Sequence, residues 1–204
     1  MANKARKNRL IVGIALLVGL ALSLTVSFGL FSSPSSTSTR QAQLNELKSQ
    51  NWTLVIDGLV DRPLNLSVFN LLSMPSTSIN AELYCVGGGT ANAVEKGTWE
   101  GVTLKSVLEE AGIHTNVTKV AFYAPDGFST DLTIQDAQRN DVIIACKKDG
   151  RFLGDKNGNP DLRLVVPGKW GYKWIRNFNH IKLVDYDFKG FYESMGYSDE
   201  ANIE

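Results

Sequence analysis

Residues 79–89 read Ile-Asn-Ala-Glu-Leu-Tyr-Cys-Val-Gly-Gly-Gly, the most informative stretch of the chain. Apolar and polar residues alternate up to Val86, which predicts a β-strand with one buried face. The three glycines that follow weaken a strand and leave the backbone free to approach a bound group closely. Cys85, at this junction of strand and glycine loop, is therefore the first candidate for a functional side chain.

The residues before this stretch predict one strand and one short helix. Residues 52–60 alternate and are rich in β-formers, so we expect an opening strand that ends in the turn Asp61-Arg62-Pro63. Apolar residues recur at near-helical spacing over 66–72, with Ser67 as the N-cap and Met74-Pro75 as the stop signal.

The residues after the glycines predict a second helix and several short strands. Apolar residues at helical spacing over 104–113, with Gly112 near the end, predict the helix. The expected strands are residues 117–123, 128–132, 142–146, 162–166 and 181–184. Many short strands with two short helices predict an α+β fold that is mainly β.

The first 50 residues differ in composition from the rest of the chain. Residues 1–9 are a basic flank, and residues 10–31 are an uncharged run of 22 residues. A helix needs roughly 20 apolar residues to cross a bilayer, so we expect a transmembrane anchor there, or else a signal peptide. The basic flank should stay in the cytoplasm, with the remainder outside it, in the periplasm or at the cell surface. Residues 32–50 are expected to form a polar tether, and residues 51–204 the folded domain.

Charge and titratable residues exclude several classes of function. Four of the 21 Lys and Arg residues lie in the basic flank, which leaves 17 against 21 Asp and Glu in the rest. A nucleic-acid-binding domain presents a basic face, so no nucleic-acid partner is expected. The two histidines, His114 and His180, have no evident partner in the sequence. No zinc-protease, serine-hydrolase, Cys-x-x-Cys or phosphate-loop pattern occurs, so those chemistries are not expected.

An ordered series of motifs runs through the expected domain. The motifs are Leu-Ser-Met-Pro at 72–75, Leu-Tyr-Cys-Val at 83–86, Trp-Glu-Gly-Val-Thr-Leu at 99–104, Asp-Gly-Phe at 126–128, Asn-Gly-Asn-Pro at 157–160, Leu-Arg-Leu-Val-Val-Pro at 162–167 and Lys-Trp-Gly-Tyr-Lys-Trp-Ile-Arg at 169–176. This order resembles the molybdopterin-binding domain of the sulfite oxidase family. It is closest in style to the family's periplasmic methionine-sulfoxide reductase catalytic subunits.

The resemblance implies a molybdenum enzyme whose metal is held by a pterin cofactor. In the family the pterin supplies a dithiolene and a single protein thiolate completes the sulfur ligands, so Cys85 is expected to bind the metal and to be catalytic. Asn157 and Arg163 fall where the family contacts the pterin. The segment that corresponds to the family's phosphate-binding site is Lys173, Trp174, Ile175 and Arg176.

The resemblance also implies a reaction and partners. Oxygen-atom transfer is expected, with a small oxyanion or a sulfoxide-type substrate. The sequence shows no haem-binding segment, so electrons are expected to be exchanged with a separate membrane cytochrome or quinone-linked subunit. After Cys85 the chain reads Val-Gly-Gly-Gly, where true sulfite oxidases show Asn-Arg, so sulfite itself is not carried over as the substrate.

The sequence allows alternative interpretations at three points. Outside the cytoplasm, Cys85 and Cys146 are candidates for a disulfide, which would make the domain a cofactor-free binding module of the same fold. Residues 155–161 space oxygen atoms alternately, as a calcium loop does, but lack the loop's glycine at the sixth position and acidic residue at the twelfth. The aromatic residues that either line a pocket or pack in the core are Tyr123, Phe128, Trp170 and Tyr172.

Overall fold

The computed structural model describes residues 52–87, 93–154 and 161–203, all within one compact unit, Ser36–Glu204. The predicted anchor at residues 10–31 and the tether at 32–50 lie outside the described residues. None of the helices in the described ranges is long and apolar enough to cross a membrane.

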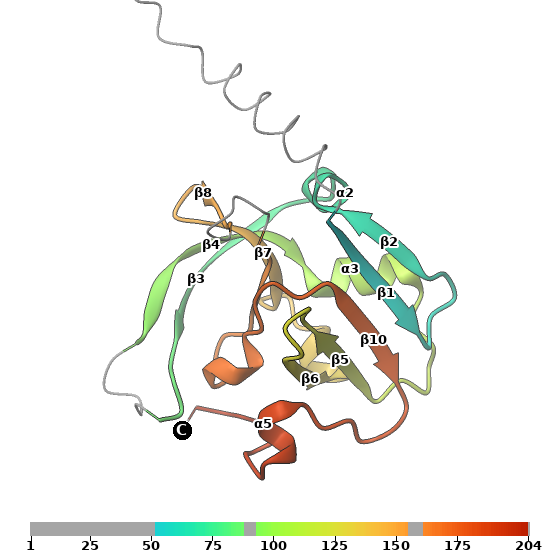
Figure 1. Cartoon of the computed structure of the whole chain (residues 1–204). Coiled ribbons are helices and arrows are strands. Elements are labelled where there is room, and N and C mark those ends of the chain that lie inside the picture. The colour runs from blue at the N-terminus through green and yellow to red at the C-terminus, as the bar shows by residue number, and fades with distance from the viewer. Residues whose placement is uncertain (1–51, 88–92, 155–160, 204) are drawn as a thin grey trace, which may run out of the picture. The chain divides into compact units, whose positions relative to one another are not determined.

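Two five-stranded sheets form the framework of the described residues (Figure 1). The strands are β1 (Thr53–Gly58), β2 (Leu64–Ser67), β3 (Thr77–Leu83), β4 (Glu95–Thr103), β5 (Lys119–Tyr123), β6 (Ser129–Thr133), β7 (Ile143–Lys148), β8 (Arg151–Phe152), β9 (Arg163–Val165) and β10 (His180–Val184). The helical elements are α2 (Val68–Ser73), α3 (Leu104–Ala111), α4 (Ile134–Ala137), the 3-10 helix η1 (Gly171–Lys173) and α5 (Phe191–Ser194).

The first sheet has the strand order β2-β1-β10-β5-β6. β1 pairs with β10 in parallel, with Val55 opposite His180, and the other neighbours in this sheet are antiparallel. The alternation predicted over residues 52–60 is confirmed, because Leu54 and Ile56 are fully buried on one face of β1. Strands from the two ends of the described chain thus lie side by side.

The second sheet has the order β3-β4-β7-β8, and β9 also pairs with β7. β3 and β4 form a long antiparallel hairpin with Leu83 opposite Glu95. The register between β4 and β7 shifts just before Gly101, where a Cβ atom would lie 2.0 Å from the carbonyl oxygen of Ile144. Glycine in the Trp-Glu-Gly-Val motif is therefore required by the close approach of β7.

The two predicted helices are present, and local signals explain both. α2 begins after Ser67, whose hydroxyl accepts from the Asn70 backbone N–H while the Asn70 side chain accepts from the Ser67 N–H. α3 begins after Thr103, contacts β4 and β7, and ends at Gly112 with φ of +76°. The expected apolar face of α3 is fully buried.

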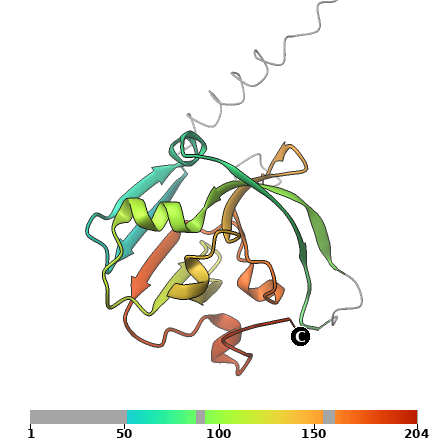
Figure 2. The same cartoon turned by 180° about the vertical axis from the view of Figure 1, so that it is seen from behind.

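The predicted α+β, mainly β architecture is confirmed, with some differences in detail (Figures 1 and 2). The strand expected to run into Cys85 ends at Leu83, so the thiol lies in the loop of the β3–β4 hairpin. The elements that the sequence did not reveal are β2, β4, β8, α4, η1 and α5. Five of these six span six residues or fewer, and β4 contains two glycines that interrupt its alternation.

Candidate active site

Cys85 lies two residues beyond β3, and its exposed thiol is free. The backbone N–H of Gly171 donates to the carbonyl oxygen of Tyr84 at 2.8 Å. A Cβ atom at position 171 would lie 2.9 Å from that same oxygen. Glycine at 171 therefore lets η1 contact the residue next to Cys85 and fix the position of the hairpin loop.

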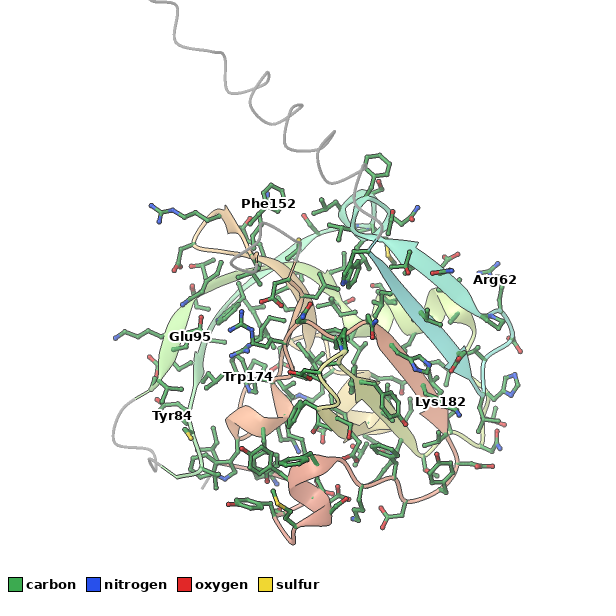
Figure 3. All side chains as sticks on the ribbon, in the orientation of Figure 1. Arg62, Tyr84, Glu95, Phe152, Trp174 and Lys182 are labelled. Carbon is green, nitrogen blue, oxygen red and sulfur yellow. The ribbon has the colours of Figure 1, made fainter. Side chains whose placement is uncertain are left out.

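Cys85 lines a pocket with a volume of about 380 Å³. The pocket is bounded by the β3–β4 hairpin, on which Figure 3 labels Tyr84 and Glu95, and by segments from four other parts of the chain. The other lining residues include Leu83, Val94, Phe128, Arg163, Tyr172 and Tyr192. Two of the four aromatic candidates, Phe128 and Tyr172, thus line the pocket. Tyr123 instead stacks on His180, with ring centroids 5.3 Å apart.

Arg163 separates this pocket from a second, smaller one. The second pocket has a volume of about 70 Å³ and is lined by Glu95, Trp99, Leu153, Asp161, Arg163 and Arg176. The Arg163 Nη2 atom donates to the Glu95 Oε2 atom at 3.3 Å, whereas the Arg163 Nε atom is buried and has no hydrogen-bond partner. Burial lowers the pKa of this guanidinium from its ordinary value, and the Glu95 carboxylate acts in the opposite direction.

Arg176 lies at the second pocket and is held by Asp161. Its Nε atom donates to the Asp161 Oδ2 atom at 3.1 Å, and the other carboxylate oxygen accepts from the Asn177 backbone N–H at 2.7 Å. The Arg176 side chain is 64% exposed, so its remaining N–H groups face open space. A single arginine at an exposed rim fits an anionic group approaching from outside.

Lys173 has partners that the sequence did not indicate. Its ammonium group is fully buried and lies 3.0 Å from the Asp131 Oδ1 atom and 2.6 Å from the Glu193 Oε1 atom. A buried ammonium requires such carboxylates, because desolvation without them is costly. The Lys173 side chain is thus bound to carboxylates in this structure and is not among the residues that line either pocket.

Trp174 and Ile175 are buried in the core, and neither is among the residues that line the second pocket. The Leu164 N–H donates to the Ile175 carbonyl at 2.8 Å, and Arg163 forms an antiparallel bridge with Arg176. The predicted set therefore divides into Cys85, Arg163 and Arg176 at the pockets, and Lys173, Trp174 and Ile175 with buried side chains. Asn157 lies outside the described residues.

Residues 41–192 match the family described as the oxidoreductase molybdopterin binding domain. The chain belongs to this family. It is an oxidoreductase of the molybdopterin class, and molybdopterin carrying molybdenum is the cofactor of that class.

Three relatives illustrate the range of this family. The chain is 28% identical over 146 residues to the oxidoreductase YuiH of Bacillus subtilis, which covers 72% of both chains. It is 31% identical over 156 residues to the protein-methionine-sulfoxide reductase catalytic subunit MsrP of Gluconobacter oxydans, covering 67% of this chain and 48% of MsrP. The solved structure of the sulfane dehydrogenase SoxCD from Paracoccus pantotrophus matches with a TM-score of 0.59 and 25% identity, over 67% of this chain and 39% of that one.

The residues present fit the cofactor of the family at two points. The buried Nε atom of Arg163 is a donor without an acceptor, which a bound acceptor group would satisfy. The free thiol of Cys85 lines the same pocket as Arg163. Among the described residues, no group of three or more His, Cys, Asp or Glu side chains is placed to hold a metal ion.

The disulfide considered from the sequence is not formed. Cys85 is exposed, whereas Cys146 is buried in β7 with its Sγ atom 3.7 Å from the Glu100 carbonyl oxygen. Burial raises the pKa of the Cys146 thiol to about 11. Asp161, the last residue of the calcium-like stretch, is paired with Arg176, and residues 155–160 lie outside the described residues.

Both histidines have carboxylate partners, which were not evident from the sequence. The His180 Nε2 atom lies 2.9 Å from the Asp57 Oδ1 atom across the parallel pair of β1 and β10. The His114 Nε2 atom lies 3.2 Å from the Asp61 Oδ1 atom. These pairs join segments far apart in sequence, which is why single-residue patterns did not reveal them.

Sequence reasoning missed two residues that line the Cys85 pocket, Val94 and Tyr192. Val94 is opposite the end of β3 only because β4 pairs back along it, with its N–H donating to the Leu83 carbonyl at 2.9 Å. Tyr192 comes from α5, near the C-terminal end of the chain. Five aromatic residues lie between positions 186 and 197, and this density was the only local signal for Tyr192.

Proposed function

We propose that this domain transfers an oxygen atom at a molybdenum centre in which Cys85 is the protein ligand. The observation that carries the proposal is the shared pocket of Cys85 and Arg163, a free thiol together with a buried guanidinium that has an unsatisfied donor. Thiolate suits a soft, redox-active metal, and metal binding keeps a cysteine deprotonated. The cofactor, when bound, supplies the change of oxidation state, as is usual for cofactor enzymes.

The chain's own residues supply the binding site along a line from Cys85 past Arg163 to Arg176. Arg163 borders both pockets and offers its unpaired Nε donor to an acceptor on the pterin. Arg176 offers its exposed N–H groups to a terminal phosphate. We assign Trp174 and Ile175 to this phosphate site through their backbone, and retain Asn157 as a pterin contact from the sequence.

The lining of the Cys85 pocket bears on the substrate. Arg163 is the only charged side chain among its described lining residues, and three aromatic rings, those of Phe128, Tyr172 and Tyr192, form much of its wall. An oxyanion gains most from several cations, whereas an organic sulfoxide presents apolar surface that aromatic rings bury. We therefore favour a sulfoxide-type substrate over a small oxyanion. The name of MsrP refers to such a reaction.

Electron exchange and location complete the proposal. The sequence suggests a membrane cytochrome or quinone-linked subunit as the redox partner, and an anchor at residues 10–31 that keeps the domain outside the cytoplasm. The pocket contains no second redox-active thiol, because Cys146 is not among its described lining residues. A partner that exchanges electrons one at a time would serve either direction of oxygen-atom transfer, because it would supply electrons when the substrate loses an oxygen atom and accept them when the substrate gains one.

The test is the metal content of the full chain, expressed in a host that makes molybdopterin. Molybdenum per protein is measured for the wild type, Cys85→Ser and the matched control Cys146→Ser. We expect near-stoichiometric metal in the wild type and the control, and loss of metal or of its redox activity in Cys85→Ser. A folded wild-type protein that carries no metal would contradict the proposal and favour the cofactor-free binding module.

A further inference from the structure

The last described segment, residues 185–203, crosses the domain as a strap. It leaves β10, forms α5 beside β6, and returns toward the end of β3 (Figures 1 and 2). Its end is fixed by backbone hydrogen bonds from Trp170 N–H to the Ala201 carbonyl at 2.8 Å and from Ile203 N–H to the Gly168 carbonyl at 2.9 Å. We call residues 185–203 the C-terminal strap.

The strap contributes one wall of the Cys85 pocket through Tyr192. The Tyr192 ring lies 5.5 Å from the ring of Tyr172 and 6.0 Å from that of Phe128, measured between centroids. All three residues line the pocket. Only Tyr192 comes from the strap, so the closure of this aromatic wall depends on where α5 is held.

A buried ion pair joins the strap to the body of the domain directly beside that wall. Glu193, next to Tyr192, is buried, and its Oε1 atom accepts from the Lys173 ammonium at 2.6 Å and from the Thr130 hydroxyl at 2.8 Å. Lys173 in turn follows Tyr172 in the chain. The ion-paired residues, Lys173 and Glu193, are thus the immediate chain neighbours of the two packed tyrosines.

Packing alone does not explain an ion pair at this place. Removing two charges from water is expensive, and apolar residues of similar volume often give equal or greater stability. What a buried pair adds is a defined geometry, because the ammonium must meet its carboxylates within hydrogen-bonding distance. Here the pair holds Glu193, the residue directly after Tyr192, inside the domain.

We infer that Lys173 and Glu193 are positioning residues that hold Tyr192 against Tyr172 and thereby set how large a molecule can reach the exposed thiol of Cys85. The inference rests on the proposed function only in treating this pocket as the active site. In this view Lys173 influences the pocket by holding α5 in place, although the family resemblance suggested that it binds a phosphate group. Glu193 acts as its partner on the strap.

The test uses full-length, cofactor-free protein with Cys146→Ala, so that it does not depend on molybdenum. The rate at which a bulky maleimide labels Cys85 is measured for Tyr192→Ala, Glu193→Gln, Lys173→Met/Glu193→Gln and the control Asp187→Asn. Asp187 is also on the strap and pairs with Lys119 at 2.7 Å, but it is 69% exposed. In the double variant Asp131 still faces Lys119 at 3.0 Å, so no buried charge is left alone.

We expect the first three variants to be labelled about tenfold faster than the parent, because a bulky maleimide must pass the aromatic wall to reach the exposed Cys85 thiol. Tyr192→Ala removes the ring itself, and each of the other two variants removes a charge-assisted hydrogen bond, a loss that shifts a local equilibrium by about that factor. Asp187→Asn should be labelled at the parent rate. Melting temperature is measured alongside, and faster labelling without general unfolding distinguishes positioning from a purely structural role. Faster labelling in Tyr192→Ala alone would overturn the role of the ion pair, and unchanged labelling in Tyr192→Ala would overturn the role of the wall.

Discussion

The indole rings of Trp99 and Trp174 meet edge to face, with centroids 5.9 Å apart and an interplanar angle of 71°. Trp99 is on β4, and Trp174 directly follows η1, the short helix beside Cys85 (Figure 3 labels Trp174). Each indole N–H is satisfied, that of Trp99 by the Ala81 carbonyl at 3.3 Å and that of Trp174 by the Lys169 carbonyl at 3.1 Å. This pair joins the hairpin that carries Cys85 to the segment that carries Arg176.

Trp174→Phe is expected to lower the free energy of unfolding by about 2 kcal/mol. The change leaves a cavity in the core and removes the donor to the Lys169 carbonyl, which is then unpaired. The measurement is denaturant unfolding followed by circular dichroism. Trp170→Phe is the matched control. Because Trp170 is only half-buried, this change should lower the free energy of unfolding clearly less. Equal losses in the two variants would contradict this role of the indole pair.

Gly171→Ala should destabilise the protein by about 1–3 kcal/mol, the usual range for overpacking. The new Cβ would lie 2.9 Å from the Tyr84 carbonyl oxygen and 3.0 Å from the Leu83 side chain, so the hairpin loop must move. Gly87→Ala places its Cβ in open space and should change stability by less than about 0.5 kcal/mol. Unfolding free energies of the two variants are compared under the same conditions. A tolerated Gly171→Ala would mean that η1 does not fix the loop.

Alkylation of the native protein at pH 8 should modify Cys85 and spare Cys146. The pKa of Cys146 is raised to about 11 by burial, so at pH 8 only about 0.1% of it is the reactive thiolate. Cys85 is exposed and free. Mass spectrometry after brief treatment with iodoacetamide should find one modification in the folded protein and two after unfolding. No modification under either condition would instead reveal the disulfide that was considered from the sequence.

Local patterns predicted much of this fold because they act within a few residues. Ser67 caps α2 through Asn70, three positions away, and the β1 alternation needs only its own residues. The partners of Lys173 lie 42 positions before it, at Asp131, and 20 positions after it, at Glu193. Tertiary packing sets those contacts. Lys173, which lies in a motif that resembles a phosphate site, therefore forms a buried ion pair in this structure.

The motifs contain residues that the fold brings together from distant parts of the chain. Arg163 and Cys85 come from separate motifs and line one pocket. Gly101 and Gly171, both inside motifs, are explained by the close approach of backbone from other strands or loops. Tyr192 lies outside every motif, and only the course of the strap brings it to the pocket.

Stability toward acid should depend on Asp199, which lies on the C-terminal strap. Partial burial acts to raise its pKa, but the ammonium groups of Lys119 and Lys189 outweigh this and hold the pKa at about 2, below the ordinary 3.8. The carboxylate therefore stabilises the fold above about pH 4, and this stabilisation is lost as the pH falls towards 2. Asp199→Asn should flatten the pH dependence of the unfolding free energy in that window. The control is Asp185→Asn, because the Asp185 carboxylate only accepts from the Asn116 amide, at 3.2 Å. This variant should retain the pH dependence of the wild type.

Arg163→Gln should reduce molybdenum per protein while leaving the fold nearly as stable. The substitution removes the buried Nε donor that has no partner, which offsets the lost contact to Glu95. Glu95 also keeps the Lys148 ammonium at 3.0 Å, so its carboxylate stays paired. Metal content and unfolding free energy are measured together, with Arg151→Gln, an exposed arginine on β8, as the control. Full metal content in Arg163→Gln would show that Arg163 is not part of the cofactor site. A decrease of more than about 2 kcal/mol in the unfolding free energy would show that its role is structural, because only a group whose partners are all in the protein costs that much to remove.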